Sequence, residues 1–174
     1  YTLTADGVFK YVSPVWTKLL GHISSEVEGK SFALFVHPDD IQICFAFLKK
    51  VLETKSNQGG VEYRVLHKNG EWRYHTTNGA PVFDSNGNII YFIGVGRDIT
   101  ENKRIAEELK ANELQFERVI ETLPISLSIV TIDGIPLYFN SKCKELFEIG
   151  TDDFIGNIYA TNFWVQPNDR LNWL

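Results

Sequence analysis

A long internal repeat constrains the architecture of this 174-residue chain more than any other feature of its sequence. The segment 6–12 returns at 133–139, an offset of 127 residues, and the segment 26–30 returns at 153–157 at the same offset. A third block, 36–40, returns at 165–169 after a slip of two residues. Ordered blocks at nearly one offset indicate two copies of one structural unit.

The repeat predicts how the chain is divided. We expect a complete unit over 1–100, a connecting segment over 101–123 and the first part of a second unit over 124–174. Because the chain begins at Tyr1, contains no Met and stops within the second copy, we also expect it to be a piece of a longer protein.

The charge balance argues against several classes of partner. The chain has 17 Lys and Arg against 22 Asp and Glu, a net charge of −5 at pH 7. It therefore lacks the basic surface of a general nucleic-acid binder and that of a protein held on an anionic membrane. Its longest uncharged apolar stretches, at 89–95 and 123–132, are shorter than the ~20 residues of a spanning helix. We expect no nucleic-acid partner and no direct membrane insertion.

The two cysteines, Cys44 and Cys143, favour a reducing compartment. One bridge is possible, but two cysteines do not make a disulfide scaffold, and cytosolic proteins keep their thiols reduced. Neither cysteine has another Cys or a His at the spacing of zinc ligands. We therefore expect a cytoplasmic protein without a metal site.

Turn and helix signals organise the first half of the first unit. An Asp-Gly hairpin signal separates two β-type runs at 1–4 and 8–12. Pro14 suits the first turn of a short helix that ends near Gly21. A longer helix is expected after Pro38.

Two aspartates at the start of this longer helix are candidate caps. The carboxylates of Asp39 and Asp40 can accept hydrogen bonds from the free amides of the first turn, and both favour the positive helix end. Apolar residues then recur at spacings of four, three and four, which predicts one buried stripe to about Glu53. Its members are Ile41, Phe45, Leu48 and Leu52.

The second half of the first unit reads as three strands. Runs rich in β-forming residues lie at 61–67, 72–83 and 89–95, and Asn-Gly turn signals separate them at 69–70 and 86–87. The order is two strands, then helices, then three strands. This order predicts an α+β fold in which helices cover one face of a single antiparallel sheet.

From Thr100, a plausible N-cap, the pattern becomes that of a helix ended by Pro124. Such a helix would be roughly 33 Å long. Apolar residues at alternating spacings of four and three form a heptad seam with one polar member. The candidate dimer seam is Ile105, Leu109, Asn112, Phe116 and Val119, continued by Leu123. A surface helix packed on its own domain is the alternative, because the seam is shorter than the three or four heptads typical of coiled coils.

Four segments carry a family resemblance. Residues 68–74, 79–87 and 94–100, together with the block from Gly29 to Asp40, resemble a PAS domain with its C-terminal PAC half. Residues 101–109 resemble the helix that joins tandem PAS domains in bacterial and archaeal sensor histidine kinases. The resemblance implies a PAS fold, with a five-stranded antiparallel sheet and helices on one face that enclose a pocket. It also implies homodimers, and sensing of light, redox state or small molecules with output through the terminal helix.

The resemblance, combined with the alternation of side chains along a strand, implies which residues face the pocket. The ligand-pocket candidates are Tyr63, Val65, His75, Thr77, Phe92, Gly94 and Gly96, and the same faces include His67, Arg73 and Gly79. The glycines would leave volume, while His75 and Thr77 would offer hydrogen bonds to a small molecule. The alternative is that these residues simply fill a core.

No cofactor is assigned, and the residues at two positions argue against covalent flavin photochemistry and against haem. The photoactive flavin branch of the family carries a Cys two to three residues after the position of Gly29, where Ser31 and Phe32 stand here. The haem branch needs an axial His on the long helix, and 39–53 contains none. His37, just before that helix, is expected to pack or cap. The flavin branch also holds the flavin ring with amide side chains. At the corresponding positions this chain has Val65, His75 and Gly96, which argues against a flavin.

The resemblance gives Asp98, Ile99 and Thr100 the role of output joint, in which Asp98 connects the last strand to the outgoing helix.

Three functions are compared: a sensory module of a sensor histidine kinase, a ligand-free dimerisation and relay module, and an enzyme. The chain shows no Ser/His/Asp order, phosphate loop or His-Glu-x-x-His motif, so we expect no catalytic residues here. The second unit, without its last three strands, should be partly mobile or lean on a neighbour.

Overall fold

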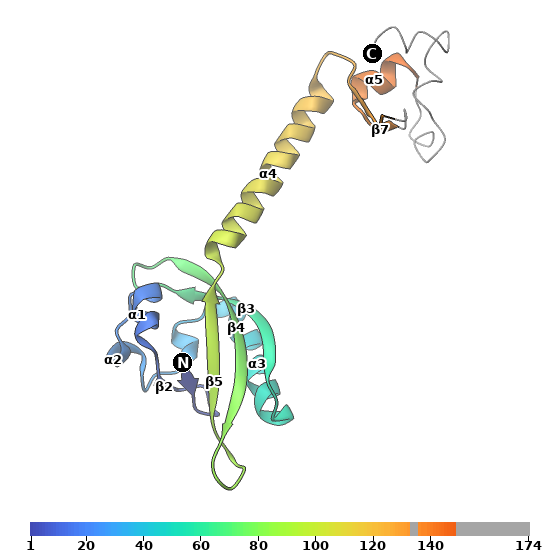
Figure 1. Ribbon diagram of the computed structural model, residues 1–174. Helices are drawn as coiled ribbons and strands as arrows, with labels where there is room; N and C mark the ends of the chain where they lie inside the picture. The colour runs from blue at the N-terminus through green and yellow to red at the C-terminus, as the bar shows by residue number, and fades with distance from the viewer. Residues whose placement is uncertain (133–135, 149–174) are drawn as a thin grey trace. The chain divides into compact units, whose positions relative to one another are not determined.

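The computed structural model describes residues 1–132 and 136–148, and the chain divides into two compact units, Tyr1–Ala106 and Glu107–Leu174. The division falls inside helix α4 (Thr100–Thr122), the long yellow helix of Figure 1. The predicted Asp-Gly turn at 133–134, the repeat blocks at 153–157 and 165–169, and the rest of 149–174 lie outside the described residues.

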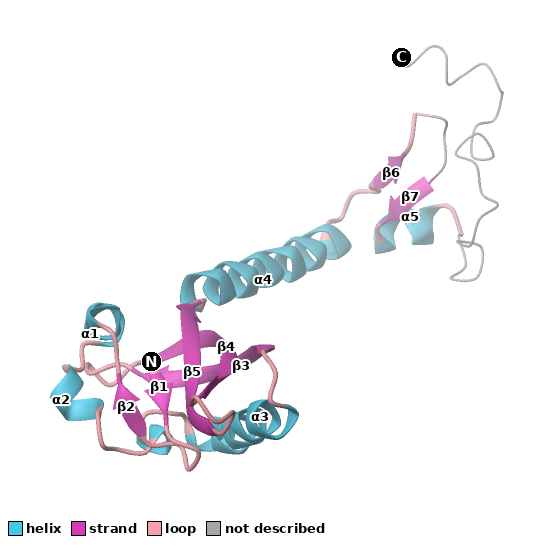
Figure 2. Ribbon diagram, turned by 60° about the horizontal axis from the view of Figure 1, so that its bottom comes forward, coloured by secondary structure: helices cyan, strands magenta, loops and turns pink. Residues whose placement is uncertain are grey.

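The first unit contains the predicted five-stranded antiparallel sheet. Its strands are β1 (Thr2–Leu3), β2 (Phe9–Tyr11), β3 (Gln58–Leu66), β4 (Trp72–Phe83) and β5 (Ile89–Asp98). They lie in the order β2-β1-β5-β4-β3 (Figure 2), so β5, the last of the five along the chain, lies at the centre of the sheet. The α+β fold class is confirmed.

The two predicted hairpin turns have the backbone geometry that their glycines allow. Gly70 and Gly87 adopt φ of 91° and 81°, a region that other residues rarely enter. In the second turn, the carboxylate of Asp84 accepts hydrogen bonds from the backbone amides of Asn86 and Asn88. These turns set the register in which β3, β4 and β5 pair.

Helices and 3-10 turns connect β2 to β3. Helix α1 (Pro14–Leu20) ends at Gly21, which has a left-handed φ of 77°, as the sequence predicted. It is followed by α2 (Ser24–Val27), by 3-10 turns at Phe32–Leu34 and Pro38–Asp40, and by α3 (Ile41–Thr54). Helix α3 packs against β3, β4 and β5, and thereby closes the core over the sheet.

The predicted capping by the aspartates is wrong, because a stronger partner takes the carboxylate. Asp40 makes no side-chain cap bond. Its Oδ2 accepts from the backbone N (2.8 Å) and Nε (2.8 Å) of Arg64, and its Oδ1 accepts from Nη2 (2.7 Å). A guanidinium and a carboxylate form paired, charge-assisted bonds that are stronger than a neutral cap. The ring of His37 does cap, since its Nδ1 accepts from Asp39 N, and it also packs on Trp72.

The predicted stripe of α3 is also partly wrong. Phe45 is 38% exposed, whereas Leu48 and Val51 are the residues of α3 that are fully buried. Cys44 and Phe47 also pack against the core. Apolar side chains occur around most of this helix, so its sequence permits more than one buried stripe. Docking on the sheet selects the face, which periodicity alone could not do.

The Asp40–Arg64 contact yields a testable pH dependence. The Arg64 hydrogen bonds hold the pKa of Asp40 below its ordinary 3.8. A lowered pKa means that the charged carboxylate stabilises the fold above pH 3.8, and that this contribution is lost as the pH falls from 3.8 through the folded value. Asp40→Asn should therefore lower the urea midpoint at pH 7, and its difference from the parent chain should shrink on acidification to pH 3.

A matched control tests whether the effect belongs to this partly buried pair. Lys49→Ala removes an exposed pair with Glu53 on α3, and exposed pairs contribute little. Its urea midpoint should stay unchanged. Equal shifts for Asp40→Asn and Lys49→Ala, or a difference that does not depend on pH, would contradict the assignment.

The second unit begins with the same order of elements as the first. Strands β6 (Ser128–Val130) and β7 (Pro136–Phe139) pair antiparallel, and α5 (Ser141–Leu146) follows. This order reproduces β1, β2 and α1 at the offset of the repeat. The segment contacts the end of α4: the carboxylate of Glu121 accepts hydrogen bonds from Tyr138 Oη and Ser141 N.

Asn140 is the centre of this segment and is completely buried. Its Nδ2 donates to the carbonyl oxygens of Ile120 (3.0 Å) and Ile125 (2.9 Å). Its Oδ1 accepts from the backbone amides of Leu127 and Cys143, both at 2.9 Å. One side chain thus joins the end of α4, the following loop and the first turn of α5.

Within the described residues, no helix combines the length and apolarity that crossing a bilayer requires. The same residues contain no group of three or more His, Cys, Asp or Glu placed to hold a metal ion.

Candidate functional site

The buried side chains of β3, β4 and β5 gather on the inner face of the sheet. The exposed fractions of Tyr63, Val65, His75, Thr77 and Phe92 are 8% or less. Gly94 is also buried, and Gly96 lies on the same face as Gly94 two residues along β5. The seven ligand-pocket candidates therefore share one face, but six of them divide between two cavities and Thr77 lines neither.

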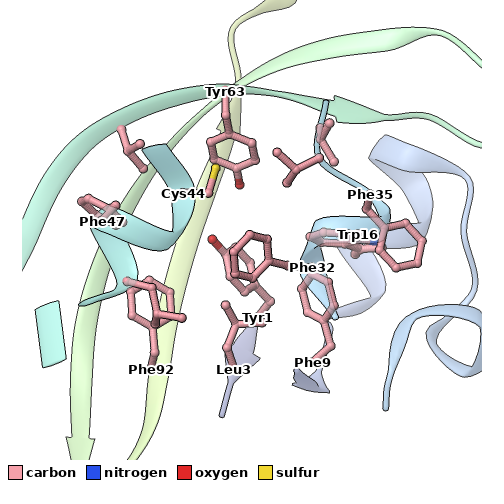
Figure 3. Close-up of a pocket in the computed structure, with 14 residues that line it drawn as sticks. Tyr1, Leu3, Phe9, Trp16, Phe32, Phe35, Cys44, Phe47, Tyr63 and Phe92 are labelled. Carbon is pink, nitrogen blue, oxygen red and sulfur yellow. The ribbon is translucent and has the colours of Figure 1, made fainter. Parts of the chain in front are cut away.

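The first cavity lies inside the aromatic core and is named the core cavity (Figure 3). Tyr63, Val65 and Phe92 are the candidates that line it. Its volume is about 40 Å³, which accommodates little more than one or two water molecules. The complete lining is Tyr1, Leu3, Phe9, Trp16, Phe32, Phe35, Val36, Cys44, Phe47, Leu48, Val61, Tyr63, Val65 and Phe92.

Two phenols and a threonine supply the polar groups of this core. The hydroxyls of Tyr63 and Thr77 lie 3.0 Å apart, and Tyr1 Oη donates to Thr77 Oγ1 at 3.5 Å. Burial raises the pKa of both Tyr1 and Tyr63, so both phenols stay protonated. Thr77 therefore anchors the two rings rather than standing free for a ligand.

The space above two of the inner-face glycines is filled, contrary to expectation. A Cβ built on Gly94 would lie 2.3 Å from the ring of Tyr1, and one on Gly79 would lie 2.3 Å from the ring of Phe92. Gly96 differs, because the nearest atom to its Cβ would be Thr77 Oγ1 at 3.4 Å. Close packing explains the correction: aromatic side chains distant in sequence occupy the volume that small residues leave.

The second cavity, named the α1 cavity, lies between α1 and the inner face of β4 and β5. His75, Gly94 and Gly96 are the candidates that line it, and its volume is about 300 Å³. Tyr1 and Trp16 line both cavities. The complete lining of the α1 cavity is Tyr1, Ser13, Val15, Trp16, Leu19, Leu20, His75, Gly94, Val95 and Gly96.

Four residues expected to face the pocket line neither cavity: Thr77 and Gly79, which are buried, and also His67 and Arg73. The Nδ1 of His67 accepts from Asn69 N and so holds the turn between β3 and β4. Arg73 Nη1 lies 3.4 Å from Asp98 Oδ2 and borders a surface groove beside the start of α4. His67 and Arg73 both lie near the strand ends, where alternation no longer decides burial.

Sequence reasoning missed the lining residues that come from outside the three long strands. Tyr1, Phe9, Trp16 and Phe35 form edge-to-face ring pairs, for example Phe9 with Trp16 at 5.1 Å between centroids. The aromatic residues, which make up 13% of the chain, were the available signal. Cys44 lines the core cavity, and burial raises the pKa of its thiol to about 12, which leaves it unreactive at neutral pH.

The predicted output joint is a compact set of hydrogen bonds between β4, β5 and α4. Asp98 Oδ1 accepts from Thr100 N at 2.9 Å. Thr100 Oγ1 accepts from Tyr74 N at 2.9 Å, and Ile99 N donates to Tyr74 O at 2.8 Å. Thr100 is thus the first residue of α4 rather than its N-cap, and its hydroxyl holds strand β4 instead.

Asp98, the last residue of β5, binds the start of the helix because its carboxylate reaches the first amide of α4. Burial opposes the charged form, but hydrogen bonds from Thr100 and the nearby Arg73 outweigh it, and the pKa of Asp98 is lowered. A carboxylate at this place also meets the positive end of the helix dipole. The joint is therefore charged at neutral pH.

The apolar members of the candidate seam on α4 are exposed. Each of Ile105, Leu109, Phe116 and Val119 is at least half exposed, and Asn112 is also exposed. The residue of α4 that is buried is Ile120, beside the contacts of Asn140. The seam therefore carries an unusual amount of apolar surface for a solvated helix.

Comparison with known proteins identifies the fold family. The model of the PAS fold matches residues 9–96. The two-component sensor PprA of Pseudomonas aeruginosa is 22% identical over 160 residues, which cover 92% of this chain and 17% of that protein. The chain spans about a fifth or less of the length of the curated relatives it matches.

Two solved structures have a similar fold. A sensory box histidine kinase/response regulator from Burkholderia thailandensis aligns with a TM-score of 0.51 and 26% identity, covering 67% of this chain and 88% of that one. The Drosophila melanogaster Cycle PAS-B domain with bound ethylene glycol aligns with a TM-score of 0.52 and 19% identity, covering 56% and 95%. The family match over half of the sequence, supported by the strand order, shows that this chain belongs to the PAS-fold family.

Proposed function

We propose that this chain is a cytoplasmic sensory module of a larger sensor histidine kinase, and that a change at the inner face of its sheet is passed to α4. The relatives support this assignment, since they include a two-component sensor and a sensory box histidine kinase. Kinase chemistry would then lie in other parts of the parent protein.

The joint between β5 and α4 carries the proposal. In the ladder between β4 and β5, His75 lies directly opposite Asp98. His75 lines the α1 cavity, and Asp98 binds the first amide of α4. A displacement of His75 by a ligand would therefore reach the helix through one strand pair. A two-state joint of this kind can convert local contacts into a change in helix position.

The test is made in the full-length protein by replacing Asp98 with alanine. Loss of the carboxylate frees Thr100 N and removes the contact with Arg73, so autophosphorylation should change by several-fold. The matched control is Asp84→Ala, which removes similar bonds between a carboxylate and backbone amides, but in the turn between β4 and β5. Equal kinase activity for the two variants, with both folded, would overturn output through the joint.

A second candidate function is that of a ligand-free dimerisation and relay module. The exposed seam on α4 and the small core cavity favour it. In this case two chains pair along α4, and the signal comes from another domain. A polar residue within a seam costs stability and specifies register.

The seam is tested by the substitution Asn112→Leu. Removal of the polar member should strengthen association by about tenfold or more, measured by analytical ultracentrifugation. Ala111→Leu is the control, because it adds the same side chain one position away from the seam. If neither variant changes the dissociation constant, or if both change it equally, pairing through this seam is wrong.

A further inference from the structure

The α1 cavity has the size of a small-molecule site. Its volume of about 300 Å³ is roughly twice that of an apolar protein cavity known to hold one benzene molecule, about 150 Å³. Val15, which lines it from α1, is exposed, whereas Leu20 and His75 are buried. The cavity thus extends from the surface to the inner face of the sheet and has room for one or two rings.

Two buried polar atoms in its walls lack partners. Trp16 Nε1 and His75 Nε2 are inaccessible to solvent and have no hydrogen-bond partner among the residues that the structure describes. Buried polar atoms nearly always have such a partner. These two are the buried side-chain exceptions found in the described part of the chain, and both belong to residues of the same cavity. This coincidence indicates that the wall is arranged for a ligand with polar groups.

The walls also indicate the charge of the ligand. Burial lowers the pKa of His75 from its ordinary 6.5, so its ring is neutral at pH 7. Among the described residues that line the cavity, no side chain is charged at that pH. An ion would lose its hydration here without gaining a counter-charge, which disfavours it strongly. The indole of Trp16 is a donor only, and the neutral His75 ring can donate or accept.

We propose that the α1 cavity binds an uncharged molecule of one or two rings that carries a carbonyl oxygen as hydrogen-bond acceptor for Trp16 Nε1 and for His75. The apolar rings contact Val15 and Leu19, and the oxygen lies at the buried end. This inference rests on the proposed sensory function and specifies its ligand class. Because His75 pairs with Asp98 across the ladder, the ligand acts next to the joint of α4.

Binding is tested with three probes that share a ring and a similar size. Acetophenone carries the carbonyl, ethylbenzene lacks an acceptor, and benzoate adds a negative charge. Each is titrated into the 174-residue chain while the indole and imidazole resonances are followed by NMR. Acetophenone should shift the Trp16 indole resonance and leave that of Trp72 unchanged. Ethylbenzene should bind about tenfold more weakly, and benzoate should not bind in the same range.

Two variants locate the site, each with a control. Trp16→Phe removes the donor but keeps an aromatic ring, and should reduce acetophenone affinity about tenfold; Trp72→Phe should not. Gly96→Val fills the cavity from a position where a Cβ meets its nearest neighbour at an ordinary 3.4 Å, and should abolish binding. Gly96→Ala keeps most of the volume and should weaken binding less. Unchanged spectra for the rest of the unit show that each variant is folded.

The outcomes separate this inference from the proposed function. Equal affinities for acetophenone and ethylbenzene, or binding that survives Gly96→Val, would overturn the assignment of ligand and cavity. If acetophenone binds as expected but autophosphorylation of the full-length protein is insensitive to it and to Gly96→Val, the binding site stands and the sensory function fails. Kinase activity that responds to Gly96→Val without any probe binding would overturn the ligand class instead.

Discussion

Replacing Phe92 with alanine should lower the free energy of unfolding of the first unit by about 3–5 kcal/mol. Phe92 is 2% exposed, lies on the inner face of β5 and pairs with the rings of Tyr1 and Phe47, each at 6.2 Å between centroids. Its ring also covers Gly79. Truncation leaves a hole that the surrounding sheet and α3 cannot close, so the transfer and cavity costs add.

The neighbouring residue supplies the control for this prediction. Ile93 lies next to Phe92 on β5, points to the opposite face and is 40% exposed. Ile93→Ala should cost about 1 kcal/mol or less. Urea denaturation followed by circular dichroism measures both variants, and the two midpoints should differ clearly. Similar losses would mean that the register of β5 is wrong, because a slip of one residue exchanges the two faces.

Replacing Asn140 with alanine should open the start of the second unit. Four backbone groups lose their partner at once: the carbonyls of Ile120 and Ile125, and the amides of Leu127 and Cys143. Each buried group left unsatisfied costs about 1–3 kcal/mol, so local stability should fall by at least about 2 kcal/mol. Hydrogen–deuterium exchange of peptides that cover 120–146 should accelerate by about 30-fold or more.

A conservative variant separates the two halves of this network. Asn140→Asp keeps an oxygen that can accept from Leu127 and Cys143, but loses the amide that donates to Ile120 and Ile125. It should accelerate exchange at the end of α4 more than at the first turn of α5. Peptides from 58–98 in the first unit serve as the internal control and should be unaffected. Uniform exchange across 120–146 in the parent chain would show that Asn140 does not organise this segment.

The repeated elements β6, β7 and α5 have a local anchor in Asn140. Asn140 caps α5 by accepting from Cys143 N, and it also fastens the segment to the preceding helix. At the repeat offset, Ser13 stands in the same position before α1, but its side chain makes no cap bond. The first unit instead closes its core with α3 and the long strands. The same local pattern is thus stabilised by different partners in the two copies.

Much of the fold could be predicted from the sequence because its signals are local. Turn glycines such as Gly70 and Gly87, the proline at the start of α1 and the alternation along β3 to β5 act within a few residues. They predicted the antiparallel sheet and the short helix after Pro14, whereas the choice of seven pocket candidates on one face came from the family resemblance together with that alternation. The family resemblance added the joint at 98–100, whose hydrogen bonds the structure describes.

Only the tertiary structure decided which side chains contact one another. The carboxylate of Asp40 binds Arg64, 24 residues away along the chain, instead of capping its helix. Tyr1 fills the space above Gly94, and Phe92 fills the space above Gly79. The buried stripe of α3 includes Leu48 and Val51 but not Phe45, and Asp98 rather than Thr100 holds the first amide of α4.

The physical reason is that each of these choices is a competition between partners that are remote in sequence. The local sequence pattern indicates which residues are apolar and where the chain turns. More than one choice of buried face is compatible with that pattern. Close packing of the aromatic side chains leaves little space in the core cavity and much more beneath α1. The division of one predicted pocket into two cavities, with His75 beside the larger one, is therefore a property of the assembled core.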